Sequence, residues 1–212
     1  MYAVARIARF LAIVTAVVAF SSTKIAQAQT AAAPAGPNTW NIDANHTASQ
    51  FSVKHLMVST VRGQFEKTTG TVDWDGKDPK TMLVNVTVDP ATVKTRVKMR
   101  DNDLRSANFF NVAKYPTITF VSKKVDVAAA GMLKMTGDLT MRGVTKEIVL
   151  DVEGPSAPIK QGQNLRVGAS ASVKINRHDW GLTYGRLVEG AAVVGDEITI
   201  TIDIEATRRL TP

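Results

Sequence analysis

Ile198-Thr199-Ile200-Thr201-Ile202-Asp203-Ile204-Glu205 decides the fold class of this chain. Isoleucine fills every second position, and a polar side chain fills each position between. Successive side chains of a β-strand point to opposite faces of its sheet. The segment therefore predicts a strand with one apolar face and one wet face.

The same alternation recurs through most of the chain and predicts an all-β fold. It appears at 51–55, 61–65, 84–88, 118–120, 133–141, 148–152 and 165–175, with a short strand at Trp40–Asp43. Turn signals such as Asp75-Gly76 and Arg142-Gly143 separate these segments. Eight substantial antiparallel strands avoid open edges most easily by closing into a barrel, and two packed sheets are the competing architecture.

One internal stretch, Arg96 to Asn111, lacks alternation and carries several charges. We interpret Lys98–Ser106 as a short helical insertion and Asn108–Phe110 as a turn that places apolar rings in the core. Pro116 then blocks helix continuation before the next strand. The prediction is an antiparallel eight-stranded barrel with a short helical insertion.

The amino-terminal segment predicts export. Arg6 and Arg9 precede an uncharged apolar run at 10–20, and Ala26-Gln27-Ala28 is a small-x-small processing site. This is the pattern of a secretory signal peptide, and the run is shorter than the roughly 20 residues of a membrane span. We expect cleavage near Ala28 and a periplasmic protein; an uncleaved amphipathic anchor is the alternative.

The predicted domain organisation follows from these segments. Residues 1–28 form the signal peptide, residues 29–38 form a disordered lead-in rich in Ala and Pro, and residues 39–212 form one barrel domain. The formal charge of +7 includes basic residues of the signal peptide, and the others are spread without an aromatic reading motif. Nucleic acid is therefore excluded as an expected partner. Without cysteine, thiol chemistry and cysteine metal sites are excluded as well.

The inward face of the predicted barrel is mixed in side-chain size. An eight-stranded barrel has room for side chains or for one small ligand. Small residues on this face would leave a space that large ones line, but alternation alone cannot distinguish a filled barrel from a lined tunnel. The candidates for a tunnel wall are Phe51, Val53, Phe65, Phe120, Met135, Gly137 and Met141. We expect Trp180, in a loop after a long strand, to cap the barrel.

Candidate chemistry is sparse, and we predict neither catalytic residues nor a metal site. His46, His55 and His178 are far apart in the chain, and none has metal-ligand spacing. Nucleophile-elbow, phosphate-loop and dinucleotide motifs are missing from the sequence. His55 lies on the apolar face of its strand, where a lone His is more often a core polar group than a ligand contact. The prediction is therefore a protein that is not an enzyme.

Several motifs in one order identify a family resemblance. They are Trp40–Thr47, Phe51–Leu56 with Ser59–Phe65, Met99–Asp101, Leu104–Phe110 with Lys114–Pro116, Gly137–Lys146, and Asp179–Leu182. The chain resembles the YceI-like family of exported lipid-binding proteins, from Thr39 to about Ala206. Two positions depart from the family pattern: Asp103 stands where His is usual, and Asn111 where Asp is frequent.

The resemblance implies a lipocalin-like barrel with an elongated apolar cavity, so it favours the lined tunnel. It implies a binding or carrier protein for a polyisoprenoid, an isoprenoid quinone or a fatty amide, with that lipid or quinone as the bound group and no other cofactor. His55, Arg100 and Asp101 are the expected polar contacts at the mouth. A homodimer and a transient membrane contact are further expectations. The alternatives are a structural or stress-protective envelope protein with incidental lipid, or an enzyme acting on quinones or lipids.

Overall fold

The computed structural model describes residues 36–185, 187–188 and 191–210. The predicted signal peptide and the lead-in up to residue 35 lie outside the described residues. Gly36 to Asn38 form a turn in which the Thr39 amide donates to the Gly36 carbonyl at 3.0 Å. The Trp74 amide donates to the Asn38 carbonyl at 3.0 Å. These three residues of the predicted lead-in are therefore held by backbone hydrogen bonds to the first strand and to Trp74.

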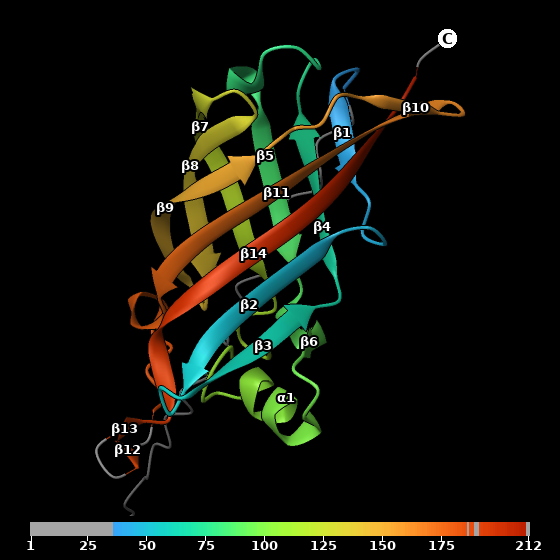
Figure 1. The fold of residues 1–212 in the computed structure, drawn as a ribbon. Helices are drawn as coiled ribbons and strands as arrows, with labels where there is room; N and C mark the ends of the chain where they lie inside the picture. The colour runs from blue at the N-terminus through green and yellow to red at the C-terminus, as the bar shows by residue number, and fades with distance from the viewer. Residues whose placement is uncertain (1–35, 186, 189–190, 211–212) are drawn as a thin grey trace, which may run out of the picture. The chain divides into compact units, whose positions relative to one another are not determined.

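The described chain contains a closed eight-stranded antiparallel barrel, which confirms the predicted fold class (Figure 1). Its strands in ring order are β11 (Asn164–Asn176), β9 (Val144–Glu153), β8 (Met132–Met141), β7 (Ile118–Ala129), β5 (Leu83–Val88), β4 (Thr68–Asp73), β1 (Thr39–Ile42) and β14 (Val194–Arg209). Pairing of all of β11 with residues 197–209 of β14 closes the ring. This is the seam to which the 198–205 segment belongs.

A second group of strands continues the wall at one end of the barrel. They are β2 (Ala48–His55), β3 (Ser59–Phe65) and β6 (Val93–Lys94). β14 has 16 residues, and its edge is divided: residues 206–207 pair with β1, and residues 194–203 pair with β2. β3 then pairs with β2, and β6 with β3. The barrel wall beside β14 is therefore formed by β1 at one end and by β2 and β3 at the other.

Short elements complete the fold. They are the strands β10 (Ile159–Gln161), β12 (Leu187–Val188) and β13 (Ala191–Ala192), and the 3₁₀ turns Pro79–Thr81, Pro90–Thr92 and Arg177–Trp180. Among the described residues, no helix combines the length and apolar character needed to cross a membrane.

The helical insertion is present. Helix α1 spans Lys98–Arg105, one residue shorter than predicted. Phe109 and Phe110 follow it and are both buried, as expected for rings placed in the core. The Phe110 ring lies edge-on against Phe65 of β3, with centroids 5.6 Å apart. The insertion is thereby anchored to the same end of the barrel as β2 and β3 (Figure 1).

The alternation failed to reveal β4. On its inward face this strand presents Thr68, Gly70 and Val72, so only one residue in three is a large apolar group. Thr68 is buried, and its hydroxyl pairs with the Ser49 hydroxyl at 2.8 Å. A side chain added at Gly70 would meet the Asn85 carbonyl oxygen of β5. A buried polar pair and a close backbone approach replace the apolar pattern here.

Candidate functional site

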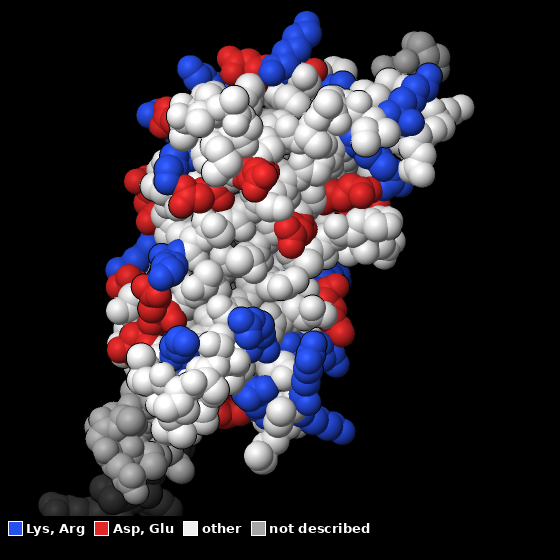
Figure 2. Space-filling view, viewed as in Figure 1, with Lys and Arg blue, Asp and Glu red and all other residues white. Residues whose placement is uncertain are grey.

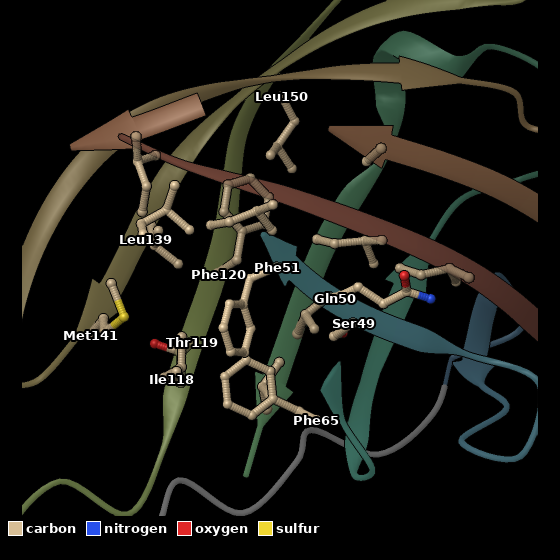
Figure 3. A pocket seen from close by; sticks show the side chains of 18 of the residues that line it. Ser49, Gln50, Phe51, Phe65, Ile118, Thr119, Phe120, Leu139, Met141 and Leu150 are labelled. Atoms are coloured by element: carbon tan, nitrogen blue, oxygen red, sulfur yellow. The ribbon is translucent and has the colours of Figure 1, made fainter. Parts of the chain in front are cut away.

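The barrel encloses a cavity of about 480 Å³, within the range typical of small-molecule sites. Figure 3 shows Phe51, Phe65, Phe120, Leu139, Met141 and Leu150 around one space, although they come from β2, β3, β7, β8 and β9. Nearly all of the lining is aliphatic or aromatic. The structure thus resolves the open question in favour of a lined cavity over a filled barrel.

Small side chains on β11 make room for this cavity. Ala169 and Ala171 point inward between the larger Val167 and Ile175, and all four line the space. Across the wall, Ile200 of β14 faces the interior yet is only partly buried. Inward apolar side chains that stay partly accessible are the expected mark of an unfilled core, because a filled one is close-packed.

Most of the predicted wall residues line the cavity. They are Phe51, Val53, His55, Phe65, Arg100, Phe120, Met135 and Met141. Three other predicted site residues, Asp101, Gly137 and Trp180, do not line it.

Gly137 lies beneath a ring and has no open space above it. A Cβ at this position would come within 2.5 Å of both the Phe120 ring and the Val121 carbonyl oxygen. Phe120 pairs with Leu139, so its ring reaches diagonally over the glycine of the neighbouring strand. The prediction that Gly137 borders the tunnel is therefore wrong, because Phe120 occupies that place.

Trp180 fills a seam in the wall and does not cap the barrel. β9 and β11 pair only at residues 151–153 and 170–172. Trp180 is 2% exposed and borders the gap beyond this pairing, beside Ile148 of β9 and Val173 of β11. Its indole nitrogen donates to the Leu139 carbonyl of β8 at 3.1 Å. Trp180 therefore fills the gap between β9 and β11 and does not line the cavity.

Asp101 is a structural acceptor. Its carboxylate is buried and accepts from the Thr95 amide at 2.7 Å and the Thr95 hydroxyl at 2.5 Å. Arg100 donates to the same Thr95, through Nε to the hydroxyl at 2.8 Å and through Nη2 to the carbonyl at 2.7 Å. Asp101 thus fixes the start of α1, and only Arg100 of the pair reaches the cavity. Asp101, expected as a polar contact at the mouth, does not line the cavity.

Charged side chains line the cavity at the end formed by β2 and α1, and we take this end as its opening. His55, Arg100 and Asp103 line the cavity and are half-buried, and Lys54 lines it and is exposed. Asp103, one of the two positions at which the sequence departs from the expected motif, lines the cavity, so a carboxylate stands at the mouth. We refer to these four residues as the mouth.

The other end of the cavity is closed by aromatic packing. Trp40 is 0% exposed, and its ring centroid lies 5.8 Å from that of Trp74. The Trp40 indole nitrogen donates to the Trp74 carbonyl at 2.8 Å, and the Arg208 guanidinium lies 4.5 Å from the Trp40 ring centroid. We call Trp40, Trp74 and Arg208 the closed end.

Arg177 is a cavity residue that the sequence analysis missed. It is 4% exposed, and its guanidinium donates to the Gly195 carbonyl at 2.9 Å and the Tyr184 carbonyl at 2.7 Å. Asp196 lies 3.0 Å from Nη2 and balances the buried charge. Arg177 therefore holds the chain after β11 against the start of β14. Its place in a 3₁₀ turn gave no periodic signal.

One cluster of possible metal ligands lies outside the cavity, at Asp43, His46 and Glu205. Arg166 already occupies it as a cation: Nη1 contacts Glu205 and lies 3.2 Å from Asp43. The His46 ring, 2.9 Å away, is the main cause that lowers the pKa of Asp43. The Glu205 carboxylate is the main cause that raises the pKa of Arg166. The cluster is an ion-pair network that joins β1, β11 and β14.

The fold and cavity define a class of protein, the β-barrels built around an internal apolar cavity. The model of the YceI-like domain matches residues 40–206, and the chain belongs to the YceI-like family. A UPF0312 protein of Staphylococcus aureus is 32% identical over 169 residues, which cover 78% of this chain and 95% of the relative.

Solved structures share the fold. The YceI protein of Campylobacter jejuni has a TM-score of 0.64 at 34% identity, covering 74% of this chain and 90% of that one. A polyisoprenoid-binding domain of Saccharophagus degradans has a TM-score of 0.60 at 18% identity, covering 80% and 98%.

Proposed function

We propose that this chain is an exported, periplasmic binding or carrier protein for one long apolar molecule, such as a polyisoprenoid, an isoprenoid quinone or a fatty amide. The observation that carries the proposal is the enclosed apolar cavity, closed by Trp40 and Trp74 at one end and open at the mouth. The polyisoprenoid-binding domain of Saccharophagus degradans, which has the same fold, supports the choice of ligand class.

The energetics favour a chain-like ligand. Each buried CH₂ group contributes about 0.8 kcal/mol, and ordering of the tail offsets part of this gain. The wall offers few polar partners, so affinity would come from length. Four polar lining residues form the mouth, where His55 can donate one hydrogen bond and accept another as a neutral imidazole. A head group would therefore lie at the mouth and the tail toward the closed end.

Mass spectrometry of organic extracts from the purified, natively folded protein tests this proposal. A matched pair of variants sharpens it. Ala171→Phe adds a ring to the cavity wall, and Ala128→Phe adds the same ring at an exposed position of β7. We expect one stoichiometric lipid from the parent protein and from Ala128→Phe, and loss of it from Ala171→Phe.

Other outcomes would select the alternatives. A heterogeneous trace of lipids, equal in all three proteins, would support an envelope protein with incidental lipid. Chemical turnover of the extracted lipid would support an enzyme.

Export and assembly are separate parts of the proposal. The amino-terminal sequence of the secreted protein tests processing near Ala28, and Met1 at the terminus would contradict it. Sedimentation equilibrium tests the homodimer that the family resemblance implies.

A further inference from the structure

The mouth is bordered by large apolar side chains that no described residue covers. Met57 and Val58, in the turn between β2 and β3, are 62% and 84% exposed. Met99, in the first turn of α1, is 81% exposed. The turn and the helix lie at the same end of the barrel (Figure 1), where His55 and Arg100 line the cavity. The apolar tips therefore lie at the end of the barrel that holds the mouth (Figure 1).

Leu56 and Met57 are unfavourable residues for the backbone conformation of the β2–β3 turn. The Val58 amide donates to the His55 carbonyl at 3.1 Å, and Leu56 and Met57 between them have φ values of +49° and +59°. Turns with two positive φ values favour Asn and Gly, since larger L-residues are strained there. The chain thus holds Met57 in an unfavourable conformation without burying it. Such a local conflict is typical of residues kept for function.

Basic side chains lie at the same end of the barrel (Figure 2). Figure 2 shows Lys and Arg gathered over the region of β2, β3 and α1. The exposed members of this group are Lys54, Arg62, Lys94, Arg96 and Lys98.

Acidic groups in the same region offset part of this charge, and the five exposed bases outnumber the three carboxylates. Glu66 lies 4.0 Å from Lys94, and buried Asp101 is hydrogen-bonded to Thr95. Asp103 accepts from the Asn108 side chain at 2.8 Å, at the edge of the cavity. Neither Asp101 nor Asp103 forms an ion pair with these bases in the described chain.

We infer that this mouth surface, formed by Met57, Val58 and Met99 with the five exposed bases, docks on an anionic lipid bilayer. The apolar tips enter the interface and the bases face lipid phosphates, which is the arrangement of peripheral membrane-binding proteins. The inference rests on the proposed function, because docking would bring the ligand entrance to the membrane from which an apolar ligand comes. Charge complementarity identifies the partner as an anionic surface, and exposed apolar tips beside the bases favour lipid over an acidic protein.

Vesicle sedimentation tests the inference. The probes are vesicles of phosphatidylglycerol and phosphatidylcholine in equal parts and vesicles of phosphatidylcholine alone. Mass spectrometry first confirms one shared amino terminus in every variant, because the apolar run at 10–20 would itself bind lipid. We expect binding to the anionic vesicles that falls with added salt. Lys98→Gln should weaken it about fivefold, and adding Arg62→Gln about fivefold again.

A double variant separates docking from folding. Met57→Gly with Val58→Ser relieves the positive φ and removes both tips, so it should bind vesicles on the order of tenfold more weakly with undiminished thermal stability. The matched controls are Ile159→Ser, which removes an apolar side chain that is 67% exposed on β10, and Lys160→Gln beside it. Both controls should bind vesicles like the parent protein.

Three results would overturn the inference: no anionic vesicle binding by the parent protein, equal losses in the mouth variants and the β10 controls, or the same affinity for both vesicle types. Lipid extraction from the same samples keeps the two proposals apart. Lipid-loaded protein that ignores vesicles refutes docking alone, and vesicle binding by protein that carries no lipid refutes the carrier function alone.

Discussion

Aromatic residues point inward at both ends of the cavity, but they are buried at one end and partly exposed at the other. At the closed end, Trp40 and Trp74 are buried with their rings tilted against each other, and the Trp40 indole nitrogen donates to the Trp74 carbonyl. On the strands β2 and β3 that lead to the mouth, the Phe51 and Phe65 rings also pack against each other, with centroids 5.7 Å apart, yet both remain partly exposed. An inward aromatic residue therefore stabilises the fold at one end and forms ligand surface at the other.

The degree of burial of an inward side chain therefore indicates whether it contributes mainly to folding stability or to ligand binding. Side chains that contact protein on every side contribute their full transfer and packing energy to folding. Side chains that face the cavity keep part of that energy available for a ligand. Substitutions at the two ends should therefore act on different measurements.

The largest expected effect is that of Trp40→Ala. Truncating a fully buried aromatic side chain costs about 3–5 kcal/mol of unfolding free energy. Phe65→Ala should cost distinctly less, because the Phe65 ring is only half-buried. Urea unfolding of both variants measures the contrast. Equal losses would show that the mouth is packed as tightly as the closed end, and would break the comparison.

Gly137→Ala should have the next largest effect. Its methyl group would meet the Phe120 ring and the Val121 carbonyl oxygen, both at 2.5 Å, and the backbone oxygen cannot move cheaply. We expect a loss of about 1–3 kcal/mol, as is typical of overpacked sites. Lipid retained per folded molecule should stay unchanged, because Gly137 lies outside the cavity. Reduced retention with unchanged stability would place Gly137 back on the wall.

How much of this could be read from the sequence depends on the range of the interaction. Alternation located most strands, since each inward side chain is set by its own strand. β4 was missed, because the Thr68–Ser49 hydroxyl pair and Gly70 carry no apolar period. The predictions for Gly137 and Trp180 were wrong because they depended on contacts between neighbouring strands. Which ring covers a glycine, and which gap an indole fills, depends on register and on where pairing stops.

The mouth was the least predictable region for the same reason. Asp101 and Arg100 are adjacent and both polar, and only the fold turns one toward Thr95 and lets the other reach the cavity. The turn at Leu56-Met57 contains none of the residues that signal a turn, because its sequence opposes its conformation.

His55→Phe probes the mouth through ligand chemistry. The substitution keeps the ring bulk and removes one donor and one acceptor. A quinone that uses such a hydrogen bond should lose about 0.5–1.5 kcal/mol, which is about tenfold or less in affinity. A matched alkane-like probe should bind almost unchanged. Parallel titrations with the two probes measure this, and equal effects on both would reduce His55 to a structural residue.

The smallest expected effect is a gain in stability. Met57→Gly tests whether the strained turn beside the mouth lowers the free energy of unfolding. Met57 holds a φ of +59°, a left-handed conformation that costs an L-residue roughly 1–2 kcal/mol. Gly removes this strain but loses roughly 0.5–1 kcal/mol through the greater freedom of its unfolded chain. Met57→Gly alone should therefore stabilise the protein by about 0.5–1 kcal/mol. The matched control is Gly131→Ala, in the β7–β8 turn with a φ of +73° and open space around it, which should destabilise by a similar amount. Urea midpoints for the two variants measure both shifts. A loss of stability in Met57→Gly would mean that the Met57 side chain contributes contacts that outweigh its backbone strain, and the mouth would then resemble the closed end.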